Sequence, residues 1–198
     1  MMVKICGITN RDDALAAVEA GAAAIGFNFY PDSPRYISPT GAALIAEKIP
    51  VSVWKVGIFV SEGAETVAKI ALNAGLDVAQ LYGTAEARGI RIWRACRTNE
   101  GISSGLSDKT VEALLLDAPS ESEGDEEYGG TGRTFDWPRA KGVPKKIIIA
   151  GGLDASNVAR AIEEAQPWGV DACSRLEKSP GLKDHDKMRQ FIRAAMQS

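Results

Sequence analysis

Eight short apolar stretches recur along the 198 residues of the chain, and segments of helical composition separate most of them. This alternation predicts a parallel β-sheet with right-handed crossovers, and eight such units close most economically into a (β/α)8 barrel. A doubly wound open sheet is the alternative, but no G-x-G-x-x-G motif follows the first stretch. We therefore expect one α/β domain over residues 1–198, a (β/α)8 TIM barrel, with strands at 3–8, 24–29, 53–60, 78–81, 90–97, 114–117, 146–150 and 170–174.

Helical spacing of apolar residues predicts helices at 12–20, 39–48, 64–74, 158–165 and about 184–196. Two units depart from the repeat. Only a brief linker separates the fourth and fifth strands, and the stretch "TNEGISSGLSDKT" after the fifth strand is too rich in glycine and serine for a full helix. We expect the barrel to have a degenerate fifth helix.

Charge and rare residue types narrow the classes of function. A net charge of −3 disfavours nucleic acid as a partner, and the apolar stretches are too short to cross a membrane. The three cysteines are far apart and odd in number, so we expect free thiols and a cytoplasmic protein. The chain has a single histidine, which argues against a histidine-based metal site or a Ser-His-Asp triad. We expect this residue, His185, in the first turn of the last helix.

Alternation of side chains along the first strand decides what faces the barrel interior. Val3 and Ile5 should pack against helices, whereas Lys4 and Cys6 should point inward. A buried ammonium group needs a partner. Because the first and eighth strands are neighbours in a closed barrel, we expect Lys4 to pair with Asp171.

Active sites of such barrels lie at the carboxyl ends of the strands. Cys6, Gln80, Asp117 and the Cys173-Ser174-Arg175 group are the polar residues at those ends. The sequence leaves two interpretations open both for Cys6 and for Asp117. Cys6 is either reactive or a small buried hydrophobe, and Asp117 is either a cleft carboxylate or a turn residue.

Two glycine clusters, "GGTG" at 129–132 and "AGGL" at 150–153, fall at this same end and favour a phosphorylated substrate, because glycine lets backbone N–H groups approach an anion. Arg35, in "YPDSPRY", suits a planar carboxylate, although a solvated surface arginine remains the alternative. The acidic run at 121–128 is expected to be a solvated loop in which a lid could lie.

The motifs "KICGIT", "AIGFNFYPDSPRYISP", "VGIFV", "LLLDA", "GGTGRTFDW", "IAGGL" and "EKSPGLKD" follow one another in this order. Together they resemble the phosphoribosylanthranilate isomerase family, and the resemblance runs from Lys4 to Asp184. It implies a (β/α)8 barrel of tryptophan biosynthesis that needs neither a metal nor a cofactor. It also implies an Amadori rearrangement of N-(5-phosphoribosyl)anthranilate.

The resemblance assigns roles to particular residues. Cys6 corresponds to the family's general base and Asp117 to its general acid, which would require opposite pKa shifts. We expect the ammonium group of Lys4 to lower the pKa of Cys6. The substrate-binding positions implied for the carboxylate and the phosphate are Arg35, Gly151, Gly152 and Ser174.

Two departures from the family pattern affect the site. The chain has "QLYG", with Tyr82, where members usually have "QLHG". After the eighth strand it has Cys173-Ser174-Arg175 where Ser-Ser-Gly is usual. Arg175 could narrow the loop or supply a cation to the phosphate, and we expect it to bind.

Two other functions remain open at this level. A histidine-pathway isomerase would act on a similar aminoribose but uses a pair of aspartates, and a non-catalytic sugar-phosphate binder would not need Cys6 and Asp117. We expect a small phosphorylated substrate as the partner, with neither nucleic acid nor membrane, and a monomer or homodimer.

Overall fold

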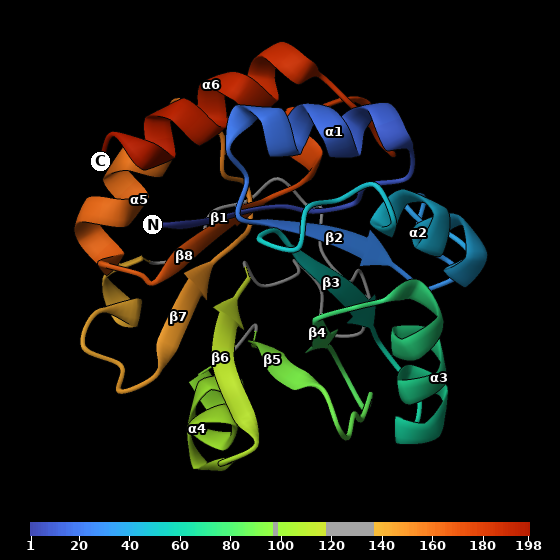
Figure 1. Cartoon of the computed structure of the whole chain (residues 1–198). Helices are drawn as coiled ribbons and strands as arrows, with labels where there is room; N and C mark the ends of the chain where they lie inside the picture. The colour runs from blue at the N-terminus through green and yellow to red at the C-terminus, as the bar shows by residue number, and fades with distance from the viewer. Residues whose placement is uncertain (97–98, 118–136) are drawn as a thin grey trace.

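The computed structural model of the protein describes residues 1–96, 99–117 and 137–198. Eight strands form a closed barrel in sequence order, and every neighbouring pair is parallel (Figure 1). This confirms the (β/α)8 barrel and excludes the open sheet. The strands are β1 (Met2–Ile5), β2 (Ala24–Asn28), β3 (Trp54–Phe59), β4 (Val78–Leu81), β5 (Arg91–Cys96), β6 (Val111–Leu116), β7 (Lys146–Ile149) and β8 (Gly169–Ala172).

The helices lie outside the ring of strands, with α1 and α6 side by side (Figure 1). Local signals set their ends: the Asn10 side chain accepts a hydrogen bond from the Asp13 N–H at 2.9 Å, and Gly21 ends α1 at φ 101°. His185 is the first residue of α6, as expected. The helices are α1 (Arg11–Ala20), α2 (Pro39–Ala46), α3 (Ala64–Ala74), α4 (Asn99–Ser107), α5 (Val158–Ala165) and α6 (His185–Met196).

The described residues give eight barrel strands but six α-helices, so the barrel is degenerate. The linker between β4 and β5 carries no helix, and a 3-10 turn, η1 (Trp137–Ala140), precedes β7. The glycine-rich stretch after β5 does form the nine-residue α4. Gly105 permits this, because a Cβ there would lie 2.6 Å from Cδ2 of Leu114 on β6. Because Gly105 has no Cβ, α4 can approach β6 closely.

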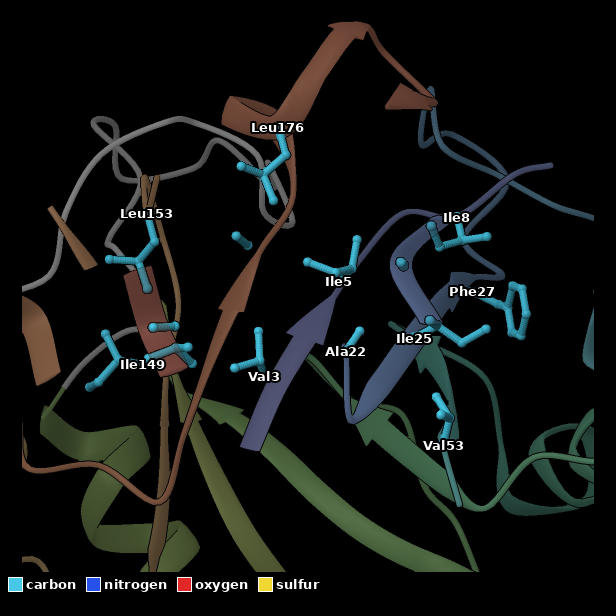
Figure 2. Close-up of a cluster of buried hydrophobic side chains, with 14 of the residues drawn as sticks. Val3, Ile5, Ile8, Ala22, Ile25, Phe27, Val53, Ile149, Leu153 and Leu176 are labelled. Carbon is cyan, nitrogen blue, oxygen red and sulfur yellow. The ribbon is translucent and has the colours of Figure 1, made fainter. Parts of the chain in front are cut away.

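The predicted alternation along β1 is confirmed. Val3 and Ile5 lie in the apolar layer between barrel and helices, beside residues of β2 such as Ile25 (Figure 2). Lys4 faces the barrel interior and is fully buried. A cluster of apolar side chains also fills the barrel interior and includes Met2, Ala24, Val56, Val78, Trp93, Ala113, Leu115 and Ile148.

Trp54, Trp93 and Trp168 pack against one another in the barrel and do not line the cavity at the carboxyl ends of the strands. Trp93 lies 5.7 Å from Trp54 and 5.9 Å from Trp168, centroid to centroid, in the same interior cluster. These contacts agree with the range for favourable aromatic pairs.

A short turn and hairpin follow β8 and cover one side of the barrel mouth. They comprise η2 (Ser174–Leu176), β9 (Glu177–Ser179) and β10 (Leu182–Lys183), with β9 and β10 antiparallel. Glu177 and Lys183 of this hairpin are both buried. Among the residues described, no helix is both long enough and apolar enough to span a membrane.

Candidate active site

One cavity lies at the carboxyl ends of the strands, where the fold places chemistry. It brings together seven residues that the sequence predicted for the site, although they come from the ends of β1 and β6 and from the loops after β2, β7 and β8. Those lining residues are Cys6, Arg35, Asp117, Gly151, Gly152, Ser174 and Arg175. The acidic run at 121–128 and the glycine cluster at 129–132 lie outside the described residues.

Lys4 and Asp171 form the expected pair beneath the cavity. Lys4 Nζ donates to Asp171 Oδ1 at 3.0 Å, and the two side chains are 0% and 7% exposed. Burial raises the pKa of Asp171 to about 7, opposed by the Lys4 charge, whereas Asp171 and Cys6 together keep Lys4 protonated by raising its pKa. The pair places a fixed cation next to Cys6.

The predicted direction of the Cys6 pKa shift is wrong. Interaction with the Cys173 side chain, together with burial, raises the pKa of Cys6 well above its ordinary value. The charge of Lys4 lowers it, as expected, but does not prevail. The raised pKa could not be predicted from the sequence, because the contact between Cys173 and Cys6 was not foreseen.

Cys173 is the thiol with the lowered pKa. The interaction with Cys6 and the positive charges of Lys183 and Arg35 lower the pKa of Cys173 to about 7, against the opposing effect of burial. Lys183 Nζ lies 3.7 Å from Cys173 Sγ and donates to its carbonyl oxygen at 3.3 Å. Cys173 is therefore the thiol of the pair that ionises more readily.

Arg35 is held by a carboxylate of the protein itself. Its Nε donates to Glu177 Oε1 at 3.0 Å and its Nη2 to Oε2 at 2.8 Å, while Lys183 Nζ lies 2.9 Å from Oε1. Hydrogen bonds from Arg35 and the charge of Lys183 lower the pKa of Glu177 despite burial. Neither Glu177 nor Lys183 was predicted as functional, although both lie in the quoted motif "EKSPGLKD".

Asp117 contacts the residue that departs from the family pattern. The Tyr82 hydroxyl donates to Asp117 Oδ2 at 3.3 Å and accepts from Gln80 Nε2, also at 3.3 Å. Asp117 is 5% exposed and its side chain lines the cavity. Tyr82, which follows β4, thus makes a polar contact with the Asp117 carboxylate. Of the two interpretations of Asp117, the structure supports a carboxylate in the cleft rather than a turn residue.

The loops after β7 and β8 have the features expected of an anion site. Gly151 and Gly152 both have positive φ, 81° and 58°, after β7, and the Asn157 amide donates to the Gly152 carbonyl at 2.9 Å. Ser174 begins η2, separated by one residue from the end of β8. Arg175 lies at the half-exposed rim, where its Nη1 is 2.9 Å from Asp154 Oδ2.

Among the residues described, no group of three or more His, Cys, Asp and Glu side chains is placed to hold a metal ion. The chemistry available to this cavity is that of a thiol pair, a buried carboxylate, a clamped arginine and a glycine-rich loop. The fold and site define a (β/α)8-barrel enzyme with acid–base groups at the carboxyl ends of its strands.

Comparison with known proteins gives the family. A family model described as N-(5'phosphoribosyl)anthranilate (PRA) isomerase matches residues 3–194. The N-(5'-phosphoribosyl)anthranilate isomerase of Solibacter usitatus is 51% identical, over 98% of this chain and 97% of that protein. The one of Pelobacter propionicus is 44% identical, over 99% and 96%. The chain belongs to the phosphoribosylanthranilate isomerase family.

Similarity to solved structures supports the same family. The crystal structure of phosphoribosyl anthranilate isomerase from Thermotoga maritima has a TM-score of 0.87 and 37% identity, covering 100% of both chains. A crystal structure of the same kind of enzyme in complex with reduced 1-(o-carboxyphenylamino)-1-deoxyribulose 5-phosphate has a TM-score of 0.83 and 34% identity, again over 100% of both chains. The histidine-pathway isomerase and the non-catalytic binder are set aside on these grounds.

Proposed function

We propose that the protein converts N-(5-phosphoribosyl)anthranilate into 1-(2-carboxyphenylamino)-1-deoxyribulose 5-phosphate, an Amadori rearrangement in tryptophan biosynthesis. Membership of the family supports the reaction. The observation that carries the residue assignment is that Cys6, Asp117 and Arg35 line one cavity together with the glycine loop after β7. A base, an acid and two anion-binding groups are what this substrate requires.

Asp117 acts as the general acid. In its protonated form it donates to the ring oxygen of the ribose, and the C–O bond opens to give a Schiff base with the anthranilate nitrogen. Tyr82 fixes the carboxyl group from the side, through the 3.3 Å contact to Oδ2. A positioned acid of this kind typically accelerates proton transfer by 10²- to 10⁴-fold, roughly.

Cys6 acts as the general base. It takes the proton from the sugar carbon next to the imine, giving an enolamine that tautomerises to the ketone. Because Cys173 ionises more readily than Cys6, Cys6 becomes a thiolate when its proton passes to the Cys173 thiolate. The two thiols share one negative charge and titrate as a pair. Lys4, whose charge favours the Cys6 thiolate, supports the transfer.

Arg35 binds the carboxylate of the anthranilate ring. Glu177 engages its Nε and Nη2, which fixes the plane of the guanidinium, and we place the substrate carboxylate against Nη1. A planar fork held in this way loses little freedom when it binds a second carboxylate. Glu177 is therefore a positioning residue for Arg35.

The phosphate is bound by the backbone of Gly151 and Gly152 and by Ser174, with Arg175 adding positive charge at the rim. Loops after the seventh and eighth strands form a phosphate site in many barrels of this fold. The small phosphorylated substrate is the partner that this cavity accommodates; a monomer or a homodimer is compatible with it.

The test follows the loss of anthranilate fluorescence when phosphoribosylanthranilate is supplied. The wild-type protein should turn it over, and Cys6→Ser and Asp117→Asn should each reduce turnover by roughly 10²- to 10⁴-fold. Cys96→Ser is the matched control, since this cysteine is 3% exposed on β5 and does not line the cavity. No turnover by the wild type, or undiminished turnover by both site variants, would refute the proposal.

A further inference from the structure

Two cysteines stand opposite each other at the closure of the barrel. In the parallel ladder of β1 and β8, Lys4 pairs with Asp171 and Ile5 with Ala172, and the Cys6 N–H donates to the Ala172 carbonyl at 2.9 Å. Cys6 and Cys173 are the next residues along each strand. Neighbouring strands are about 4.8 Å apart, which falls within the Cα–Cα range of about 4.4–6.8 Å that a disulfide spans.

The side chains point into the same space. Both thiols line the cavity and both are part-exposed to it. A Cβ added to Gly7, the residue after Cys6, would lie 2.8 Å from Cys173 Sγ, so the sulfur of Cys173 rests against the backbone next to Cys6. Interaction between the two side chains is also the largest cause of the pKa shifts of both thiols. The two sulfurs therefore lie close enough to interact.

The charges around Cys173 favour its reactive form. Lys183 Nζ lies 3.7 Å from its sulfur and Arg35 adds a second positive charge, whereas Glu177 Oε1, 3.9 Å away, opposes them. The pKa of Cys173, lowered to about 7, leaves roughly half of it as thiolate at pH 7, compared with about 3% for an ordinary thiol of pKa ~8.5. Thiolates are the attacking species in disulfide exchange.

The third cysteine lacks these features. Cys96 is 3% exposed, and burial raises its pKa to about 11. The three thiols of one chain thus differ sharply in accessibility and charge.

We propose that Cys6 and Cys173 are an oxidation site: a small-molecule disulfide such as glutathione disulfide links them reversibly, and the bond removes the catalytic base. The loss of activity rests on the proposed function, whereas the bond itself does not.

The exchange takes two steps. The Cys173 thiolate attacks one sulfur of glutathione disulfide, an S–S bond to Cys173 forms, the glutathione S–S bond breaks and one glutathione thiolate leaves. Cys6 then loses its proton to solvent and its sulfur attacks Cys173, which displaces the second glutathione thiolate. In sum, two protein thiols lose two electrons and two protons, and glutathione disulfide is reduced to two glutathione thiols.

The experiment incubates the full-length protein with glutathione disulfide, quenches with acid, and maps cysteines by mass spectrometry of protease digests. The wild type should yield a crosslinked peptide pair containing Cys6 and Cys173, two hydrogens lighter than the free peptides, and turnover should fall in proportion to the crosslinked fraction. Dithiothreitol should restore both. The rate of crosslinking should rise with pH through about 7, as Cys173 ionises.

Variants separate the two thiols. Cys6→Ser should stop at a glutathione adduct on Cys173. Cys173→Ser, which restores the residue usual in the family, should form no crosslink, and whatever turnover it has should resist glutathione disulfide. Cys96→Ser should crosslink like the wild type.

Two outcomes would overturn the inference: glutathione adducts without a Cys6–Cys173 crosslink in the wild type, or equal loss of turnover in Cys173→Ser. The crosslink is measured without substrate, so its failure is distinguishable from a failure of the isomerase assay. A crosslink in a protein that does not turn over phosphoribosylanthranilate would reject the proposed function and keep the oxidation site.

Discussion

Replacing Asp171 by leucine tests the electrostatics beneath the cavity. The 3.0 Å pair with Lys4 is almost wholly buried, with side chains 7% and 0% exposed. At an effective dielectric constant of 20, a separation of 3.0 Å corresponds to an attraction of about 5.5 kcal/mol. Desolvation of both ions offsets much of this in the intact pair, but removing one partner leaves the other charge buried and uncompensated, which typically costs about 3–5 kcal/mol.

We therefore expect Asp171→Leu to lower the free energy of unfolding by about 3–5 kcal/mol, which corresponds to a fall in Tm of roughly 6–20 °C for a chain of this length. The measurement is urea denaturation followed by circular dichroism at pH 8. This pH is chosen because burial raises the pKa of Asp171 to about 7, and the carboxylate must be ionised in the wild type.

The matched control is the double variant Lys4→Met/Asp171→Leu, in which no charge is left unpaired. Its stability should return to within about 1 kcal/mol of the wild type, because a buried ion pair and an apolar replacement of similar volume are often equivalent. Its turnover should stay low, since the cation that lowers the pKa of Cys6 is gone. A single variant within 1 kcal/mol of the wild type, roughly, or a double variant as unstable as the single one, would refute the reasoning.

Four further outcomes are expected. Because protonation of the low-pKa thiol leaves two neutral thiols, kcat/KM should fall as the pH drops through about 7, the pKa of Cys173; a profile flat from pH 6 to 8 would contradict the shared charge. Arg35→Lys keeps the charge but loses the fork, so KM should rise by at least roughly tenfold, the equivalent of ~1.4 kcal/mol for a charge-assisted hydrogen bond, and an unchanged KM would remove Arg35 from the binding site. Tyr82→Phe removes the hydroxyl that contacts Asp117 and should lower kcat more than it changes KM, with Tyr82→His as the variant that restores turnover; equal kcat in all three would make the contact incidental. Arg175→Gly should raise KM while changing stability by less than about 1 kcal/mol, since its ion pair is half exposed; a lower KM would show that the side chain hinders the phosphate.

Much of the fold could be predicted from local pattern alone. Alternation of apolar strands with helical segments indicated the barrel, and period-two alternation placed Lys4 inward and Val3 outward. The least accurate expectation concerned the glycine-rich stretch after β5, which forms the nine-residue α4. Composition argued against a full helix, but Gly105 packs closely against Leu114, where a Cβ would lie 2.6 Å from Cδ2, and helix propensity does not contain such a tertiary contact.

The candidate site divides in the same way. Residues at strand ends could be predicted, because parallel strands bring all their carboxyl ends to one side of a barrel. The partners of those residues could not. Tyr82 was noticed as a departure, but its contact with Asp117 across 35 positions of the sequence was not foreseen. Likewise the sequence suggested Arg35 for a carboxylate, and the structure shows Glu177 already bound to it.

The sequence by itself therefore determined which side chains face the interior and which stand at the mouth, because backbone geometry fixes these choices within a few residues. Tertiary structure decided which of them touch. Closure of β1 against β8 joins Lys4 to Asp171, 167 residues away, and brings Cys173 beside Cys6. That contact reverses the expected pKa shift of Cys6 and lowers the pKa of Cys173 instead. The reason is that pKa shifts depend on the few charges and hydrogen bonds within several ångströms, whatever their separation in sequence.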